Sequence, residues 1–207
     1  KVDALQQYMK EFDVYENKII MLALRNSEVH YWNKVIREKI GFTKELEIGD
    51  LINIQENWVR DDFCLYNGEK GIVLDVGVKT VFAGLRFQKC KIKFHRYKKN
   101  IIFNSFVMLD SLETNNGSLK VEQEKFLIHE AIRINKNFRE NRRREFDPFV
   151  GSLRIKHAYA MTCHKAQGSE WENVLIHPYK YSDELRWQYT AFSRARNDVK
   201  IIGENGV

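Results

Sequence analysis

The sequence predicts an α/β chain in which a parallel-sheet domain is interrupted by a small inserted β-barrel. A continuous apolar run at 19–24 is typical of a strand buried on both faces of a parallel sheet. Short strands separated by turn residues between about 51 and 109 favour a small barrel. Alternating strand and helix patterns return after Pro148. We therefore expect a discontinuous α/β domain at 1–45 and 147–207, and a barrel with a basic, helical segment at 46–146.

Composition limits the class of protein. Of the 207 residues, 43% are hydrophobic and 30% are charged, which is enough for a globular core. No apolar run approaches the roughly 18 residues of a membrane-spanning helix. Three widely spaced cysteines argue against a disulfide framework or a metal cluster and favour a reducing cytoplasm. The chain starts at Lys1 without a methionine, as expected for a piece of a longer protein.

The first segment predicts helix, strand, helix. Apolar residues fall at helical spacing over 2–12 and again from Val29 to Ile40, on either side of the apolar run. Gly41 then stands where a helix C-cap belongs.

The middle segment predicts strands and then helix. Asn67-Gly68 is a hairpin signal, and a polar, helical stretch is expected from Val121 to Arg144. Strands are expected at Leu51–Ile54, Gly71–Val76, Cys90–Phe94 and within Ile101–Leu109.

The last segment returns to α/β. Ser182 is a good N-cap for a helix that runs through Phe192. Strands are expected at Ala158–Thr162, Val174–Ile176 and Val199–Ile202.

A polar loop follows the strand that ends at Thr162. It reads Thr-x-His-Lys-x-Gln-Gly-x-Glu over 162–170 and offers hydroxyl, imidazole, ammonium, amide and carboxylate groups. Ligands bind α/β sheets at such loops, although any one of these residues alone is more often a solvated loop residue.

A second segment, Tyr189–Arg196, lies on the predicted helix and carries Arg194. A guanidinium group on a rigid element can donate a planar fork of hydrogen bonds to a phosphate. A lone helical arginine is more often part of a surface ion pair.

Together, the loop at 162–170 and Tyr-Thr-Ala-x-Ser-Arg-Ala-Arg at 189–196 resemble motifs V and VI of superfamily 1 DNA helicases of the UvrD, RecD and Dda type. Leu24-Arg25-Asn26 resembles motif IV. Gly49-Asp50-x-Ile52-x-Ile54, followed by Asn67-Gly68-x-x-Gly71, resembles the SH3-like domain inserted in RecD-like and Dda-like helicases. The resemblance implies the second, C-terminal RecA-like motor domain, of P-loop NTPase type, with an SH3-like insertion.

The resemblance also implies roles for individual residues. ATP sits between two RecA-like domains in this family, and Arg194 matches the motif VI arginine that acts on the γ-phosphate. The implied nucleotide contacts are Arg25, Gln167, Gly168, Glu170 and Arg194. The implied contacts to single-stranded nucleic acid are Thr162, His164 and Lys165.

The phosphate-binding loop Gly-x-x-x-x-Gly-Lys-[Ser/Thr] is absent from the sequence, and Asn67–Gly71 has the wrong spacing. We therefore expect ATP and Mg²⁺ to be bound mainly by an N-terminal RecA-like domain of the same polypeptide. We expect the chain by itself to be inactive.

The net charge of +6 suits a polyanionic partner such as single-stranded DNA. Cations concentrate at 86–99 and at 133–144, and within the first stretch Lys91, Lys93 and Arg96 are candidate nucleic-acid contacts. The alternative is that both stretches are solvated faces.

Two other functions stay open at this point. One is a non-catalytic nucleic-acid-binding module, which would not need to keep Arg194 and Glu170. The other is an RNA helicase of the same superfamily, although the Gln-Gly-Ser-Glu form of motif V and the barrel look more like bacterial or phage DNA enzymes. For a DNA enzyme, roles in DNA repair and recombination are expected.

Overall fold

The computed structural model describes residues 18–60, 63–96, 99–114, 117–177 and 185–202. The chain divides into two compact units. The sheet unit comprises Lys1–Thr43 and Ala158–Val207, and the barrel unit comprises Lys44–His157. The helix predicted at 2–12 and the N-cap predicted at Ser182 lie outside the described residues.

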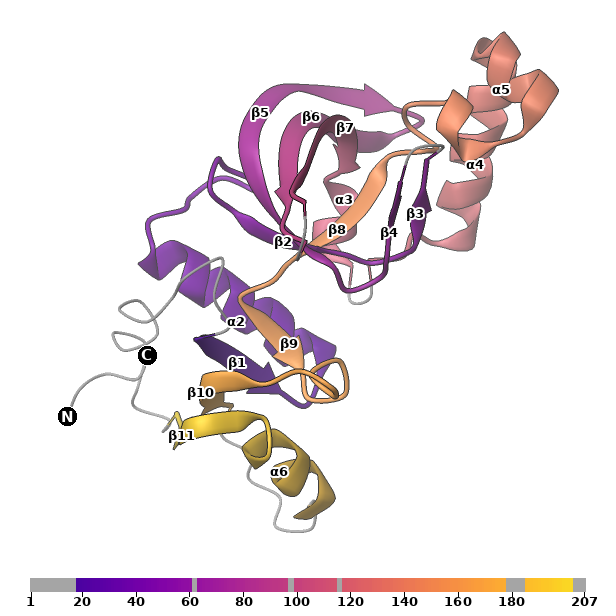
Figure 1. Ribbon diagram of the computed structural model, residues 1–207. Coiled ribbons are helices and arrows are strands. Elements are labelled where there is room, and N and C mark those ends of the chain that lie inside the picture. The colour runs from indigo at the N-terminus through magenta and orange to yellow at the C-terminus, as the bar shows by residue number, and fades with distance from the viewer. Residues whose placement is uncertain (1–17, 61–62, 97–98, 115–116, 178–184, 203–207) are drawn as a thin grey trace. The chain divides into compact units, whose positions relative to one another are not determined.

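The sheet unit is α/β, with a four-stranded parallel sheet in the order β11-β10-β1-β9 (Figure 1). Its elements are β1 (Ile19–Ala23), α2 (Asn26–Lys39), β9 (Ala160–Thr162), β10 (Trp171–Ile176), α6 (Leu185–Phe192) and β11 (Ala195–Ile201). All residues of β1 are buried, because strands lie on both of its sides and apolar side chains cover both faces.

A buried amide fastens α2 to the sheet. The Asn33 side chain, 5% exposed, accepts hydrogen bonds from the backbone N–H groups of Tyr159 (2.9 Å) and Ala160 (3.0 Å). Its amide group donates to the carbonyls of Val29 (3.0 Å) and Ala160 (3.4 Å). One neutral side chain therefore positions the start of β9, the strand that leads into the polar loop.

The barrel unit contains a closed five-stranded barrel, β2-β5-β6-β7-β8, and a two-stranded sheet, β3-β4. The strands are β2 (Leu51–Ile54), β3 (Trp58–Val59), β4 (Cys64–Leu65), β5 (Lys70–Phe82), β6 (Leu85–Phe94), β7 (Ile101–Met108) and β8 (Leu153–His157). The helices are α3 (Asp110–Glu113), α4 (Val121–Ile134), α5 (Lys136–Asn141) and the 3₁₀ turn η1 (Arg144–Phe146).

The last barrel strand comes from a segment that the sequence assigned to the α/β domain. β8 pairs antiparallel with β2 and parallel with β7, which closes the barrel. Leu153 and Ile155 are fully buried in its core. The chain therefore returns to the sheet unit at Ala158, after the boundary expected at 147.

The tight hairpin of the barrel is not at the predicted dipeptide. Gly68 has a positive φ of 89°, but β4 pairs with β3 and β5 pairs with β2 and β6, so Asn67-Gly68 turns the chain without joining paired strands. The two-residue hairpin turn is Ala83-Gly84, between β5 and β6, with φ values of 49° and 71°. Positive φ at both turn residues matches the right-handed twist of the flanking strands.

A helical lobe, residues 121–146, packs on the outside of the barrel (Figure 1). Leu127 and Ala131 of α4 and Phe138 of α5 are buried against Leu85 and Phe87 of β6. The helical stretch predicted from Val121 to Arg144 is broken at Asn135, whose side chain accepts from the backbone of Phe138 and caps α5.

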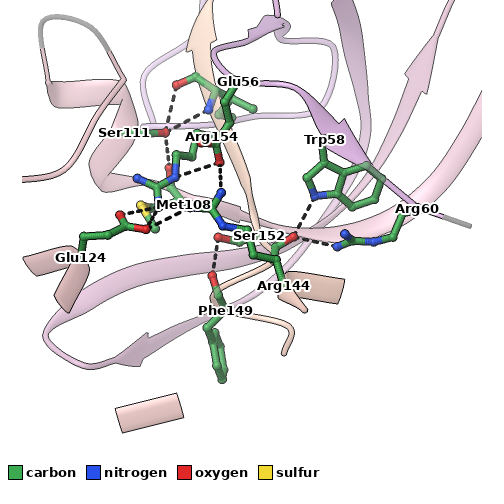
Figure 2. A network of polar contacts seen from close by, with 12 residues as sticks. Glu56, Trp58, Arg60, Met108, Ser111, Glu124, Arg144, Phe149, Ser152 and Arg154 are labelled. Carbon is green, nitrogen blue, oxygen red and sulfur yellow. Dashed lines mark hydrogen bonds and ion pairs between the residues drawn. The ribbon is translucent and has the colours of Figure 1, made fainter. Parts of the chain in front are cut away.

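An ion-pair network joins the helical lobe to the barrel wall (Figure 2). Arg154 of β8, whose side chain is 7% exposed, donates to both carboxylate oxygens of Glu124 at 2.8 and 2.6 Å. Its Nε lies 3.1 Å from a Glu56 oxygen but is not aligned for a hydrogen bond. Arg144 binds the same two carboxylates, at 2.9 Å to Glu56 and 3.1 Å to Glu124.

No helix in the described part of the chain is long and apolar enough to cross a membrane. Within the same residues, no group of three or more His, Cys, Asp or Glu side chains is placed to hold a metal ion.

Candidate nucleotide and nucleic-acid site

The polar loop begins at Thr162, the last residue of β9, where the sequence predicted a strand to end. The loop turns tightly, because the Ala166 N–H donates to the Thr162 carbonyl at 3.1 Å and the Ser169 N–H to the Ala166 carbonyl at 3.1 Å. Gly168 has a φ of 82°, which L side chains rarely adopt, and no atom lies within 4 Å of where its Cβ would be. The loop is compact, and the space beside the Gly168 backbone, where a side chain would lie, is open.

Most of the polar side chains of the loop face solvent. His164, Lys165, Gln167 and Glu170 are exposed, whereas Thr162 is 9% exposed. Partial burial of the ammonium group lowers the pKa of Lys165. The loop therefore presents donors and an acceptor that a bound ligand could reach.

Arg194 does not lie on the helix as the sequence predicted. Helix α6 ends at Phe192, and Ala195 already begins β11. The Arg194 N–H donates to the Ala191 carbonyl at 3.2 Å, and its own carbonyl accepts from the Trp171 N–H at 2.9 Å. Arg194 thus lies in a short turn whose backbone is hydrogen-bonded to the end of α6 and to the first residue of β10.

The half-buried Arg194 guanidinium is held only by neutral oxygens in the described part of the chain. Nε donates to the Thr190 carbonyl at 3.2 Å, and the two terminal nitrogens donate to the Ser169 carbonyl at 3.3 Å and the Ser193 hydroxyl at 3.1 Å. Ser169 belongs to the polar loop, so the two predicted motifs meet here. The positive charge is positioned without being neutralised.

Glu170, by contrast, has a partner. Its carboxylate accepts from Nε of Arg196 at 3.0 Å, and the two side chains are 52% and 66% exposed. An exposed pair of this kind contributes about 0–1 kcal/mol, so a ligand could displace it at little cost.

Arg25 lies at the end of β1. Its backbone N–H and that of Leu24 donate to one oxygen of Glu28, at 2.9 and 3.1 Å, which caps the start of α2. The Arg25 side chain is exposed and has no partner among the described residues.

The structure does not bring Arg25 and Arg194 to the same end of the sheet. Ala23 is in register with Thr162, so Arg25 follows the carboxyl ends of the strands. Arg194 precedes Ala195, which is in register with Trp171, the first residue of β10. The length of β10, roughly 17 Å at 3.3 Å per residue, separates the two ends.

Sequence reasoning missed His177, which follows β10 at the same end of the sheet as Arg25. Its Nδ1 accepts from the indole N–H of Trp32 at 2.9 Å, and its Nε2 lies 3.7 Å from Glu28. No local pattern pointed to His177, because its partners are 145 and 149 residues away in sequence.

In the barrel unit, the cations grouped by sequence separate into two sets. Lys89, Lys91 and Lys93 alternate with buried residues on β6 and so point outward in one row. Arg96, by contrast, is held in a bidentate pair with Glu69 and also donates to the Cys64 carbonyl. This pairing raises the pKa of Arg96 and occupies its guanidinium, so the structure separates Arg96 from the lysine row.

Comparison with known proteins finds a match in the segment that contains the polar loop. Residues 157–202, which hold the polar loop and Arg194, match the sequence profile of the UvrD-like helicase C-terminal domain. This segment is therefore similar to the C-terminal domain of superfamily 1 helicases. Mouse DNA helicase B (Mus musculus) is 39% identical to this chain over 62 residues, which cover 29% of this chain and 6% of that protein.

A solved structure described as two coordinating Pif1 helicases unwinding forked double-stranded DNA shares the fold. It has a TM-score of 0.51 at 16% identity and matches 98% of this chain. Pif1 from Candida albicans has a TM-score of 0.47 at 13% identity, over 100% of this chain and 51% of that one. The match covers 43% of the first Pif1 chain, so this chain spans less than half of that protein's length.

Proposed function

We propose that this chain is the C-terminal motor domain of an ATP-dependent DNA helicase and that Arg194 is its arginine finger. The main support is the geometry of the Arg194 guanidinium group. It donates hydrogen bonds to three neutral oxygens, and no carboxylate among the described residues pairs with it. Such a cation can stabilise the charge that develops on a transferring phosphoryl group, an effect of about 10³–10⁵ in rate. The names of the relatives, DNA helicase B and Pif1 helicases on forked DNA, favour DNA over RNA.

The loop at 162–170 would supply the other nucleotide contacts. Gly168 leaves space for a ligand to approach the backbone, and Gln167 and Glu170 are exposed beside it. Binding there would exchange the weak Glu170–Arg196 pair for contacts to the nucleotide. Arg25 is the second proposed phosphate contact, from the other end of the strands.

The proposed ATP and Mg²⁺ fit this chain only in part. Arg194 suits a phosphate, but the described residues contain no acidic cluster for a metal, and the sequence has no phosphate-binding loop. Mg²⁺ would therefore be held by an N-terminal RecA-like domain of the same polypeptide. The purified chain alone should release no phosphate from ATP with magnesium and single-stranded DNA.

Two surfaces are proposed to contact single-stranded DNA. In the sheet unit they are Thr162, His164 and Lys165, at the carboxyl end of β9. In the barrel unit they are Lys91 and Lys93, and we add Lys89 because it points outward in the same row. We also propose, as the resemblance implies, that the barrel is SH3-like and couples the motor to unwinding.

The test is made in the full-length protein. Arg194→Ala should lower the DNA-stimulated ATPase rate at least about 10³-fold and leave nucleotide affinity nearly unchanged, because the guanidinium meets charge formed in the transition state. Arg194→Lys should not restore the rate, since an ammonium cannot reproduce the fork. Arg186→Ala, an exposed arginine on α6, is the matched control.

Near-normal turnover of Arg194→Ala would show that Arg194 is not the finger. Absence of turnover in the unmodified full-length protein would instead favour a non-catalytic nucleic-acid-binding module.

A further inference from the structure

We infer that the tip of the helical lobe is a second docking site for the phosphate backbone of nucleic acid, with Arg139 and Arg142 as its contacts. The inference rests on the proposed function, since it assigns another surface to the same class of partner. The tip is formed by α5 and the turn that follows it (Figure 1).

The basic stretch at 133–144 contains six cations, and the structure separates those with carboxylate partners from those without. Arg133 pairs with Glu130 at 2.7 Å, and Lys136 lies 3.9 Å from Glu140. The other paired cations are Arg143, which pairs with Glu145, and Arg144, which takes part in the network of Figure 2.

Arg139 and Arg142 are the remaining two. Both side chains are exposed, and neither has a hydrogen-bond or ion-pair partner within the described residues. Their charge is therefore available to an external anion. In the network of Figure 2, by contrast, an external anion would have to compete with Glu56 and Glu124 for Arg144.

Arg142 also adopts a backbone conformation that an arginine disfavours. It is the C-cap of α5 with φ 58° and ψ 12°, in the left-handed region, and its N–H donates to the Phe138 carbonyl at 2.8 Å. Glycine is the usual residue at a helix end of this geometry. A residue other than glycine in this region costs free energy, and such residues cluster at functional sites, while the Arg142 side chain lies in solvent.

The tip is rigid enough to present both cations in a defined place. Phe138 is 3% exposed and anchors α5 in the apolar cluster shared with the barrel. The Asn135 amide donates to the Phe146 carbonyl at 2.9 Å and to Asp147 at 3.0 Å. A preorganised site loses less conformational freedom on binding.

The chemistry of the tip fits phosphate. Arginine forks match phosphate oxygens, and the neighbouring Asn137 and Asn141 side chains are exposed and neutral. The lobe packs on Leu85 and Phe87, and Lys89 is the next outward residue of the same strand. A nucleic-acid backbone is favoured over an acidic peptide because the outward lysine row continues along the strand that the lobe covers.

The experiment uses the whole chain and fluorescence anisotropy with a labelled single strand and a labelled duplex of the same sequence. The test variant is Arg139→Gln with Arg142→Gly. The matched control is Arg133→Gln, which removes an exposed but paired arginine from the same lobe. The test variant should bind several-fold more weakly than the control.

The salt dependence adds a second readout. Loss of two phosphate contacts should reduce the slope of log K against log salt by about 1.4 for a single strand or about 1.8 for a duplex. The probe for which the test variant loses more affinity identifies whether the tip contacts a single strand or a duplex.

Misfolding is separated from lost binding by Arg142→Gly alone. Glycine relieves the left-handed backbone, so the melting temperature should hold or rise while affinity falls. Affinity of the test variant equal to that of the control, for both probes, would overturn the inference. Labelled polyglutamate serves as a third probe. If the test variant binds only this probe more weakly than the control does, the tip is assigned to acidic peptides and the inference is also overturned.

Failure of this inference can be distinguished from failure of the proposed function. Loss of binding in Lys89→Gln with Lys91→Gln, but not in the arginine variant, would reject only the tip. No binding by the unmodified chain would reject the tip and the proposed nucleic-acid contacts together.

Discussion

A buried polar anchor in the sheet unit and one in the barrel unit differ in charge. In the sheet unit, the neutral amide of Asn33 satisfies two backbone N–H groups and fastens α2 to β9. In the barrel unit, the charged side chain of Arg154 joins β8 to α4 through Glu124. A charged anchor needs carboxylates close by, whereas an amide needs only backbone groups.

The same contrast separates the cation proposed to act on the nucleotide, Arg194, from cations with a structural role. Arg86 in the barrel unit is surrounded by Glu45, Asp110 and Glu113, and this pairing raises its pKa. Arg194 in the sheet unit donates only to neutral oxygens among the described residues. The basic composition therefore does not show where a ligand would bind. The presence or absence of a carboxylate partner at each cation indicates a candidate site.

The largest stability effect is expected at the charged anchor. Arg154→Ala should destabilise the barrel unit by about 2–3 kcal/mol, because Glu124 and Glu56 lose a partner while partly buried. Urea denaturation of the chain would measure the change. Arg133→Ala, which breaks an exposed pair, should cost only about 0–1 kcal/mol. An equal loss of unfolding free energy in the two variants would show that the buried ion pair contributes no more than an exposed one.

A somewhat smaller effect is expected at the neutral anchor. Asn33→Ala should cost about 2 kcal/mol, because the N–H groups of Tyr159 and Ala160 are left buried without their acceptor. The same denaturation experiment applies, with the exposed Asn26→Ala as control. A cost as low as that of the control would mean that β9 does not depend on this amide.

Lys70 should give the barrel unit a pH dependence. Burial lowers the pKa of Lys70 to about 8 from its ordinary value of 10.5. Between these two values the unfolded chain binds more protons than the folded chain, so stability should rise with pH, by an amount on the order of 1 kcal/mol. Below about pH 8 the cost of burying the charge is fully present.

Lys70→Met should remove this rise, whereas the exposed Lys89→Met should retain it. Denaturation midpoints at pH 8 and pH 10 would show the difference. If the stability of the Lys70 variant changed with pH as that of the unmodified chain does, burial of the Lys70 ammonium group would not be the cause of the pH dependence.

The smallest effect is expected at the exposed pair of the sheet unit. Glu170→Gln or Arg196→Gln should change stability by about 0.5 kcal/mol or less, because both side chains are more than half exposed. A double-mutant cycle at low and high salt would measure the coupling energy. A coupling well above about 1 kcal/mol would make this pair a structural element and weaken its proposed role at the nucleotide.

Local patterns in the sequence were sufficient for several elements. The apolar run at 19–24 became β1, Leu51–Ile54 became β2 with the predicted bounds, and the strand before the polar loop ended at Thr162 as expected. Each of these depends on residues that are adjacent in sequence.

Other features depend on distant residues and could not be predicted in this way. Pairing with β2 and β7 places Leu153–His157 in the barrel. Pairing with Glu69, 27 positions away in sequence, occupies the guanidinium group of Arg96, one of the candidate nucleic-acid contacts. The hairpin turn is Ala83-Gly84, where strand pairing imposes a positive φ on an alanine that shows no turn signal of its own.

The sequence by itself determined the α/β class, the inserted barrel and the two motif segments that resemble those of superfamily 1 helicases, because these follow from hydrophobic periodicity and from the order of a few residues. Only the tertiary structure decided which cations are neutralised and which are left for a ligand. Residues such as Arg154 and Glu124 are 30 positions apart, and an ion pair forms only when folding brings its two charges within about 4 Å.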